Sequence, residues 1–293
     1  MLFKYSSVNK YSLANLENHQ IFLNHHSFFN DPFECRCSIL TGFPSLEDTS
    51  GRFADILRAW GFEKTDDKDA LENYEEYISS LDGAEPDIEH YIESARITCF
   101  SKRSDNVLMW GHYADGLRGF CIEYDADLIV DAQENTNIYQ VLYAELPSVV
   151  DASVMAVLHD QWYFNNEAFS EVEALAKRLS QDRVYELSLY ENGIKSSHFQ
   201  IQELYQKMLA TKPLAWSYEE ELRLIECAPR EDCSGITMFY PRSAVKSVVL
   251  GERITKDHEQ ALVSIVSKNF PTAKIKKAIR VNGSFDVHIV DYI

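Results

Sequence analysis

The segment KPLAWSYEEELRLI, residues 212–225, decides how the chain is interpreted, because a helical pattern ends here and a strand pattern begins. Pro213 closes the preceding helix, since proline lacks the amide hydrogen that a helix interior needs. If the strand starts within the run of glutamates, Glu219, Glu221 and Arg223 share one face, because side chains alternate along a strand. The two carboxylates then lie about 7 Å apart at Cα, the rise of two strand residues, and form a candidate acid/base pair.

These charged side chains support two interpretations. In the functional one, Glu219 and Glu221 are catalytic and Arg223 binds substrate. In the structural one, Glu221 and Arg223 pair with each other or with a charge on a neighbouring strand, since opposite charges on one strand face attract. The sequence alone leaves both interpretations open.

Strand signals recur on both sides of this segment and predict the fold class. Each candidate is a short run rich in apolar, β-branched or aromatic residues. The candidates are residues 21–23, 96–100, 119–124, 138–143, 221–225, 236–240, 245–250, 274–281 and 284–292. Thr255 is placed to cap a helix that runs to about Asn269, and the dipeptide Asn282-Gly283 predicts a type I′ hairpin turn. We therefore predict an α+β fold with a mixed or antiparallel central sheet and a C-terminal β-α-β-hairpin segment.

Two segments interrupt the strand pattern, and we predict that both are helical insertions in a single α+β domain of residues 1–293. Residues 45–95 hold fifteen Asp/Glu and four Lys/Arg, a net charge of 4 − 15 = −11, with apolar residues at helical spacing. Residues 148–211 show helical spacing as well. The acidic segment is interpreted as solvated surface helices, because like charges on a helix face favour water.

Composition and charge exclude several classes of protein. The chain has 293 residues, of which 45% are hydrophobic and 25% charged, so it is neither disordered nor collagen-like. Its net charge of 28 − 46 = −18 argues against a non-specific nucleic-acid coat. No apolar run approaches the roughly 18 residues that a membrane span needs, and the first residues lack the pattern of a signal peptide. We therefore expect a cytoplasmic protein without a membrane partner.

The sequence contains no P-loop, Rossmann, nucleophile-elbow, zincin or kinase motif, so function has to be inferred from clusters of polar and aromatic residues. The first cluster lies in FNDPFE, residues 29–34. Pro32 keeps Asp31 out of the helical region, which predicts a rigid turn or an extended loop. Asn30, Asp31 and Glu34 in such a turn can orient a ribose or a metal ion; alternatively, Asn30 and Asp31 simply cap the turn.

The second cluster surrounds MWGHYADG, residues 109–116, and follows a predicted strand that ends at Ser101. Trp110, His112 and Tyr113 place aromatic surface beside an imidazole within one helical turn. His112 can serve as an acid, a base or a hydrogen-bond donor near neutral pH, and the rings can enclose a nicotinamide or a nucleobase. Alternatively, Trp110 is a core residue and His112 bonds a backbone carbonyl.

The sequence does not predict a metal site. None of the six cysteines forms a CxxC pair, so the common zinc-binding spacing is absent. The adjacent pair His25-His26 can bind a metal, but no third and fourth ligand follow at a recognisable spacing. Reduced thiols are the expected state of these cysteines in a cytoplasm.

These clusters, in this order, resemble the domain-of-unknown-function 2971 family of bacteria and their mobile elements. The matching pieces span residues 3 to about 251. They are FKY at residues 3–5, FNDPFE at 29–34, CFS at 99–101, LMWGHYADG at 108–116, GFCIEY at 119–124 and WSYEEELR at 216–223. Members of the family occur beside defence or toxin-like genes, which implies an effector that acts on nucleotides or nucleic acids in phage defence or as a toxin.

The chain also resembles ADP-ribosyltransferase-like folds, through an early strand with Lys4 and Tyr5, a middle strand that ends at Ser101, and a late Glu219-x-Glu221. This resemblance implies transfer from NAD to a nucleic-acid or protein acceptor, with no metal cofactor. Glu221 would stabilise the oxocarbenium-like charge that develops as nicotinamide leaves. Glu219 would orient or deprotonate the acceptor.

The same resemblance implies a set of substrate contacts. Ser101 and Tyr113 would hold the nicotinamide ribose and ring, and His112 or Asn30 would contact the dinucleotide. Further substrate-binding candidates are Lys4, Tyr5, Asp31, Trp110 and Arg223. We therefore predict one cleft lined by residues near 30, 101, 112 and 221.

Two other classes of function remain open. A metal-dependent nuclease or phosphodiesterase would bind a divalent ion through Asp31, Glu34, Glu219 and Glu221, with His112 as the base. A non-catalytic module would bind a nucleotide or a nucleic acid without turnover. The segment 242–280, with nine Lys/Arg against three Asp/Glu, suits either nucleic-acid hypothesis.

Overall fold

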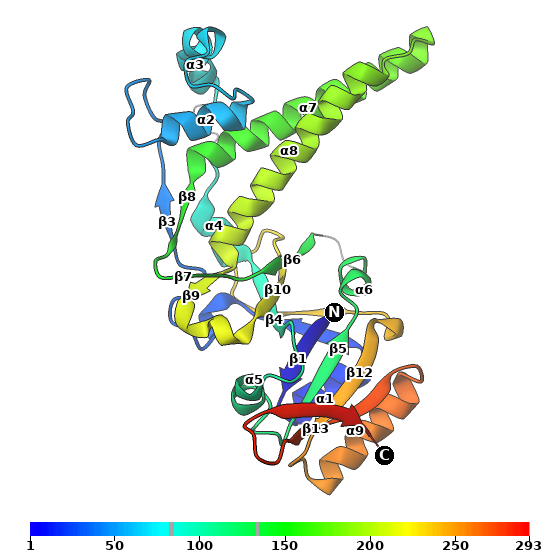
Figure 1. Cartoon of the computed structure of the whole chain (residues 1–293). Helices are drawn as coiled ribbons and strands as arrows, with labels where there is room; N and C mark the ends of the chain where they lie inside the picture. Colours follow the sequence, from blue (N-terminus) through cyan, green and yellow to red (C-terminus); the bar gives the residue numbers. More distant parts are fainter. Residues whose placement is uncertain (82–84, 133–134, 293) are drawn as a thin grey trace. The chain divides into compact units, whose positions relative to one another are not determined.

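The computed structural model describes residues 1–81, 85–132 and 135–292 (Figure 1). The fold is α+β, as predicted, with a mixed and mostly antiparallel central sheet. Across these described ranges the chain divides into two compact units. The sheet unit comprises Met1–Cys35, His90–Leu146 and Ala210–Ile293, and the helical unit comprises Arg36–Glu89 and Pro147–Leu209.

The helical unit brings together the two predicted insertions. The acidic insert, residues 45–95, and the helical region, residues 148–211, are far apart in the sequence, yet most of both belongs to this unit. Residues 82–84 of the predicted insert lie outside the described residues. We still predict that the two units unfold together as a single domain. The cooperativity of unfolding tests this prediction.

The central sheet belongs to the sheet unit and has eight strands within the described residues. Their spatial order is β14 (Val287–Asp291), β13 (Lys274–Arg280), β12 (Val245–Gly251), β5 (Phe120–Tyr124), β1 (Leu2–Ser6), β4 (Arg96–Ser101), β10 (Glu221–Glu226) and β6 (Thr136–Gln140). Neighbouring strands are antiparallel except β12 and β13, which are parallel and joined through α9 (Lys256–Asn269). A parallel pair needs such a crossover, and the predicted β-α-β-hairpin segment is confirmed.

The register of β1, β4 and β10 gathers the sequence motifs at one place. Phe3 in β1 lies opposite Ser101 in β4, and Ser101 lies opposite Glu221 in β10. Arg223 lies opposite Cys99 on the same pair of strands. The early, middle and late motifs of the chain therefore become neighbours in space, although they are far apart in the sequence.

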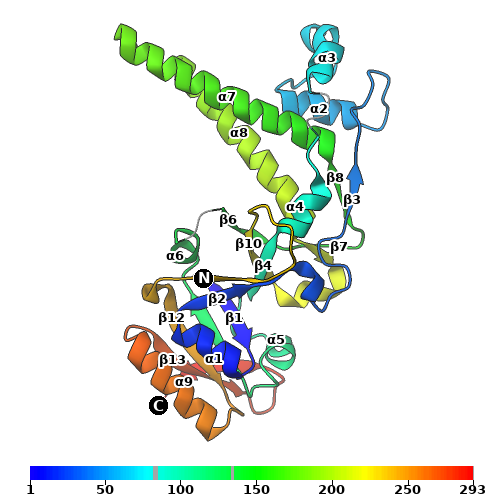
Figure 2. The same ribbon diagram turned by 180° about the vertical axis from the view of Figure 1, so that it is seen from behind.

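Short helices and strand pairs surround the central sheet. They are α1 (Lys10–Glu17), η1 (His26–Phe28), α4 (Ile88–Ser94), α5 (Val107–His112), α6 (Ala126–Val130), η2 (Leu214–Glu219), η3 (Arg242–Ala244), the pair β2 (Gln20–Leu23) with β11 (Ile236–Phe239), and the pair β7 (Leu142–Ala144) with β9 (Thr211–Pro213). The helices α1 and α9 lie side by side (Figure 2), and Asn269 Nδ2 donates to the carbonyl of Glu17 at 3.4 Å. Leu16, Leu262 and Phe270 are buried in the core there, each contributing about 1.5–3 kcal/mol by leaving water.

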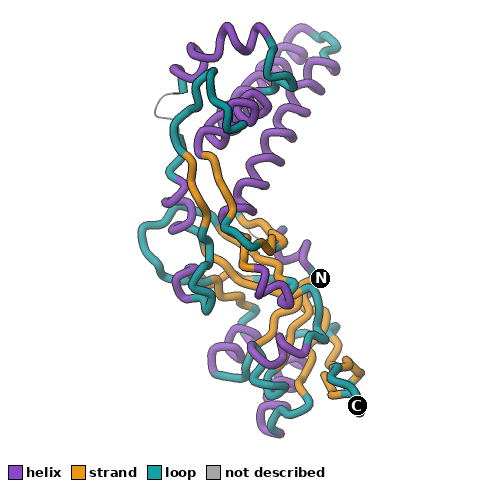
Figure 3. Tube along the Cα trace, turned by 60° about the vertical axis from the view of Figure 1, so that its left-hand side comes forward, coloured by secondary structure: helices purple, strands orange, loops and turns teal. Residues whose placement is uncertain are grey.

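The helical unit is built on two long helices that run side by side, α7 (Ala152–Leu179) and α8 (Val184–Leu209) (Figure 3). Its other elements are β3 (Cys37–Leu40), α2 (Arg52–Trp60), α3 (Lys68–Ser80) and β8 (Ser148–Asp151). Arg52 Nε donates to Asp151 at 2.6 Å and so ties α2 to the start of α7. No helix in the described part of the chain combines the length and the apolar character needed to cross a membrane.

Two local predictions are wrong. The hairpin of β13 and β14 has no two-residue type I′ turn, because Val281 N donates to Asp286 O at 3.0 Å and closes a four-residue loop. Gly283 has a positive φ of 81°, but Asn282 does not, whereas a type I′ turn needs both. The predicted strand 138–143 is also two strands, since β6 ends at Gln140 and β7 pairs with β9 instead.

Candidate functional site

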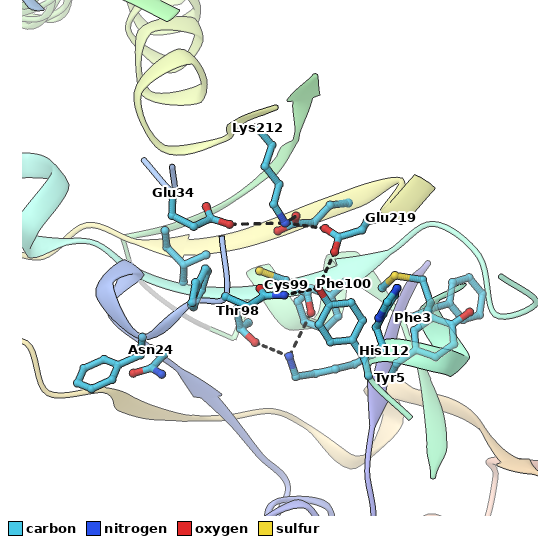
Figure 4. A pocket seen from close by; sticks show the side chains of 18 of the residues that line it. Phe3, Tyr5, Asn24, Glu34, Thr98, Cys99, Phe100, His112, Lys212 and Glu219 are labelled. Carbon is cyan, nitrogen blue, oxygen red and sulfur yellow. Dashed lines mark hydrogen bonds and ion pairs between the residues drawn. The ribbon is translucent and has the colours of Figure 1, made fainter. Parts of the chain in front are cut away.

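A pocket of about 510 Å³ opens in the sheet unit, at the place where β1, β4 and β10 are adjacent (Figure 4). Its lining comes from these three strands, from the segment around η1, from α5 and from β9 and η2. Seven predicted site residues line it together: Lys4, Tyr5, Asn30, His112, Tyr113, Glu219 and Glu221. The structure therefore brings the N-terminal, middle and late motifs to one cleft.

The backbone around the glutamates differs from the prediction. Glu219 ends the 3₁₀ helix η2 and is not part of a strand. Glu220 then adopts a left-handed conformation with a φ of 44°, and β10 begins only at Glu221. The expected single strand face with Glu219, Glu221 and Arg223 is therefore wrong. The turn at Glu220 nevertheless directs both neighbouring carboxylates to one ammonium group.

That ammonium group belongs to Lys212, in β9. Its Nζ lies 2.6 Å from Glu219 Oε2, 2.9 Å from Glu221 Oε2 and 3.5 Å from Glu34 Oε1. Figure 4 shows Glu34 and Glu219 on opposite sides of the lysine. Arg223 contributes a second cation, because its guanidinium lies 2.8 Å from Glu221 and 2.6 Å from Glu34. We call these five side chains the Lys212 network.

The Lys212 network is buried, with each of its side chains no more than 4% exposed. Charges removed from water are costly unless each one has partners of opposite sign. Three carboxylates here share two cations, and each carboxylate contacts Lys212. The arrangement is therefore stable only as a set, and removal of one member leaves the others uncompensated.

The two neighbouring glutamates respond to this environment in opposite directions. Burial by itself raises the pKa of Glu221, but Arg223 and Lys212 outweigh burial and hold that pKa at about 2. Burial raises the pKa of Glu219, and the contacts with Lys212 and Tyr113 offset this only in part. Glu221 is thus ionised at neutral pH, whereas the pKa of Glu219 is higher than that of an ordinary glutamate.

A hydrogen-bonded chain leads from the pocket mouth to Glu219. Asn30 Nδ2 donates to the Tyr113 hydroxyl at 3.5 Å, and that hydroxyl donates to Glu219 Oε1 at 2.5 Å. Burial raises the pKa of Tyr113 above its usual value, so the phenol stays neutral and keeps its proton as a donor. The predicted substrate contacts Asn30 and Tyr113 therefore also position a glutamate.

Lys4 forms another charged part of the pocket lining. Its Nζ donates to Thr98 Oγ1 at 2.7 Å and to the carbonyl of Cys99 at 3.1 Å. Burial lowers the pKa of this lysine, although Cys99 and Glu221 act in the opposite direction. The ammonium also lies 5.2 Å from the centre of the Phe100 ring, within the range of a cation–π contact.

The remaining lining is mostly aromatic. Its apolar members are Phe3, Phe22, Phe28, Phe29, Phe100 and Met109. His112 lies at the exposed side of this lining, with its ring 5.9 Å from that of Tyr218. A pocket with aromatic side chains and a set of fixed charges suits a ligand that has both a flat ring and polar groups.

Four predicted site residues lie outside the pocket lining. Ser101 is fully buried and donates to the carbonyl of Glu219 at 2.8 Å. Trp110 is a core residue, with Nε1 donating to the Ser104 carbonyl at 2.8 Å. Asp31 caps its own turn by accepting from Phe33 N at 2.9 Å. Arg223, the fourth, is buried and pairs with Glu221 and Glu34. None of these four side chains is part of the pocket lining.

Sequence reasoning missed Lys212 as a site residue and named Glu34 only as a possible contact of a ribose or a metal ion. Lys212 stands in the same segment as the glutamates, which is a weak signal. Its position is set by the parallel pairing of β7 with β9, where Lys212 lies opposite Tyr143. Pairing of that kind joins segments far apart in the chain, so spacing along the sequence does not reveal it.

The comparisons with known proteins agree with the motif analysis. Residues 109–224 match a protein family described as "Protein of unknown function (DUF2971)". The matched region contains His112, Tyr113, Lys212, Glu219 and Glu221, so the expected resemblance to this family is confirmed over this part of the chain. No curated protein and no solved structure shows a significant match.

Proposed function

We propose that this chain is a nucleotide-directed transferase of the ADP-ribosyltransferase-like kind, which uses NAD as donor and acts as a bacterial defence or toxin-type effector. The observation that carries the proposal is the pair Glu219 and Glu221. Both line one pocket, and their environments shift their pKa values in opposite directions. Such a divergence assigns different roles to two carboxyl groups in one site.

The proposed reaction breaks the bond between the nicotinamide nitrogen and C1′ of the adjoining ribose. The bonding electrons leave with nicotinamide, and positive charge develops on the ribose ring. The fixed carboxylate of Glu221 stabilises that charge, because a preorganised group needs no reorganisation as the charge appears. An acceptor oxygen or nitrogen then bonds to C1′, and Glu219 takes the proton that the acceptor releases.

The aromatic lining supports a flat donor ring. Phe29 and Phe100 line the same pocket as the Lys212 network. Aromatic side chains hold planar rings by stacking and edge contacts, while polar groups fix their orientation. A nicotinamide ring that is positively charged in the donor also complements the ionised Glu221 and becomes neutral when it leaves.

The geometry disfavours a metal-dependent nuclease at this pocket. Its expected ligands included Glu34, Glu219 and Glu221, but each of these carboxylates already contacts Lys212. A divalent ion would compete with that ammonium group and would be repelled by it. Asp31, the other expected ligand, lies outside the pocket lining and accepts a hydrogen bond from its own turn.

The second candidate is a non-catalytic module that binds a nucleotide. The observation in its favour is that Glu221 already has Arg223 on one oxygen and Lys212 on the other. Paired charges are typical of structural networks as well as of active sites. The module predicts NAD binding without release of nicotinamide.

The test compares the wild-type protein with Glu221→Gln and Glu220→Gln in the presence of NAD and of either nucleic acid or protein acceptors. Released nicotinamide is measured. Glu220 is a matched control, because it stands between the two site glutamates and pairs at 3.5 Å with the exposed Arg103 instead. We expect Glu221→Gln to lower the rate by at least about 100-fold and Glu220→Gln to leave it nearly unchanged.

Binding of NAD by each variant, measured by calorimetry, separates the candidates. A Glu221→Gln variant that is folded by circular dichroism and binds NAD without turnover supports the transferase. Wild-type protein that binds NAD but releases no nicotinamide with any acceptor supports the binding module. Cleaved nucleic acid in the presence of added Mg²⁺ would instead show a nuclease, whatever happens to NAD.

A further inference from the structure

A second group of ionisable side chains lies in the sheet unit, outside the pocket lining. It consists of His25 and His26 at the start of η1 and Glu93 near the end of α4, and we call it the His–Glu cluster. One donor atom from each residue lies within 4.8 Å of the other two. Across the part of the chain that the structure describes, no other group of three His, Cys, Asp or Glu residues meets this criterion.

The donor atoms have the spacing of a metal coordination sphere. His25 Nε2 lies 3.2 Å from Glu93 Oε2, and His26 Nε2 lies 3.3 Å from Glu93 Oε1. Ligands at roughly 2.0–2.1 Å from a tetrahedral zinc ion are separated from one another by about 3.3 Å, which follows from the tetrahedral angle. Both contacts between an imidazole and the Glu93 carboxylate therefore have the separation of two ligands on one zinc ion.

His25 is the buried member of the His–Glu cluster. Its Nε2 faces the Glu93 carboxylate, with Oε2 at 3.2 Å, so this nitrogen points into the cluster. Its other ring nitrogen, Nδ1, accepts from Ser27 N at 3.2 Å and also lies 2.7 Å from the Ser27 hydroxyl. When Nε2 binds an ion, the ring proton lies on Nδ1, and the Ser27 hydroxyl is then the nearby oxygen that accepts it, as is usual for metal-bound histidines.

The surroundings hold Glu93 in place and leave it open to solvent. The Arg96 guanidinium donates to the carbonyls of Glu93 and Ser94, both at 3.0 Å, and so fixes the last turn of α4. The Glu93 side chain is 58% exposed, which provides an entry path for an ion. The backbone is thus fixed while the carboxylate remains accessible.

We propose that His25, His26 and Glu93 bind a divalent transition-metal ion, most favourably Zn²⁺, with a fourth position open to water. Two imidazoles and one carboxylate suit zinc, which accepts nitrogen and oxygen ligands in tetrahedral geometry. Mg²⁺ and Ca²⁺ are excluded as preferred ions, because they select oxygen ligands. This site is separate from the Lys212 network and does not depend on the reaction proposed for the pocket.

The metal would connect two segments that form part of the pocket. Residue Asn24 and residues Phe28 and Phe29 line the pocket on either side of the two histidines. Glu93 lies on α4, which leads directly into β4 and its lining residue Thr98. An ion bound between the two segments would hold Phe28 and Phe29 of the pocket lining close to β4. The role of the ion is therefore structural.

The experiment measures binding of Zn²⁺ to the full chain by calorimetry and the absorption spectrum of the Co²⁺-loaded protein. We compare wild type, His26→Ala, Glu93→Gln and His258→Ala. The last is a control, because His258 is exposed at the start of α9 and belongs to no cluster. We expect one Zn²⁺ per chain, an affinity at least about tenfold weaker in the first two variants, and no change in the control.

Two results would overturn the proposal. One is a wild-type chain that binds no Zn²⁺ at micromolar concentrations. The other is binding that is equally strong in His26→Ala and Glu93→Gln, which would assign the ion to other surface histidines. Neither variant removes the buried His25, so both are expected to fold, and circular dichroism checks this. Nicotinamide release plays no part in this test, so its outcome is independent of the transferase proposal.

Discussion

The Lys212 network and the His–Glu cluster are both groups of ionisable side chains in the sheet unit, but their charges are balanced differently. In the network, Lys212 and Arg223 neutralise three glutamates away from water. In the cluster, Glu93 faces two imidazoles and is largely exposed. The same residue type is therefore a fixed charge in one place and an available ligand in the other, and its cationic partners make the difference.

The largest expected effect comes from removing the shared cation of the network. Lys212→Met leaves Glu219 and Glu221 buried with one fewer positive charge, which we expect to destabilise the fold by about 3–5 kcal/mol. Urea unfolding measures the change. The matched control is Lys246→Met, since Lys246 forms a half-exposed pair with Asp125 at 3.0 Å and should cost about 0–1 kcal/mol. Equal effects of the two substitutions would contradict a cooperative network.

A somewhat smaller effect concerns acid stability. The pKa of Glu221 is about 2 in the folded protein against a usual value of 4.5, so its ionised form favours folding above the usual pKa. About 3 kcal/mol of stability is then lost as pH falls from about 4.5 towards 2. Glu219 has a raised pKa and the opposite sign, since acidification relieves its burial.

The free energy of unfolding checks both signs, between pH 2 and about 4.5 for Glu221 and above about pH 4.5 for Glu219. In Glu221→Gln the acid-induced loss should become shallower than in wild type, because the group responsible is gone. In Glu219→Gln it should become steeper. If the free energy of unfolding changed with pH in the same way in all three proteins, these two carboxyls would not control the loss of stability in acid.

The next effect concerns the hydrogen bond to Glu219. Tyr113→Phe removes the hydroxyl that donates to this carboxylate at 2.5 Å. That bond lowers the pKa of Glu219, so its loss raises this pKa further. We expect kcat/KM for nicotinamide release to fall about tenfold and the acidic limb of its pH profile to move to higher pH. Tyr11→Phe, at an exposed tyrosine, is the control, and a lowered rate with an unshifted profile would contradict the role.

The smallest effect is expected in the His–Glu cluster. Without added metal, His26→Ala should change the free energy of unfolding by no more than about 0.5 kcal/mol, because the side chain is partly exposed and pairs with an exposed glutamate. With Zn²⁺ at 100 times its dissociation constant, wild type should gain about 2.7 kcal/mol and the variant much less. Thermal unfolding in zinc and in chelator measures both. If His26→Ala strongly lowered the free energy of unfolding in chelator, without any metal, the prediction would be contradicted. The cluster would then stabilise the fold by its own charge pairs, as the Lys212 network does.

The fold was predictable where the signal is local. The β-α-β-hairpin segment follows from the apolar runs at β12 and β13 and from Thr255, whose side chain accepts from His258 N at the start of α9. The turn between β13 and β14 was not predictable, because the hydrogen bond from Val281 N to Asp286 O sets the length of the loop. Periodicity identifies an element, whereas register decides how its neighbours are connected.

The site was predictable in part for the same reason. Asn30, His112 and Glu221 stand in motifs with unusual side chains, and they do line one pocket. Ser101 and Trp110 have similar motifs but face the core, since a side chain's direction depends on the sheet that covers it.

By itself the sequence determined most of the strands and helices, several of the residues that line the pocket, and the resemblance to one protein family. Only the tertiary structure decided which charges meet. Lys212 reaches Glu221 through the pairing of β9 with β7, and Glu93 reaches His25 because α4 leads into β4 beside β2. The physical reason is that backbone patterns act over a few residues, whereas electrostatic partners are chosen by distance in space.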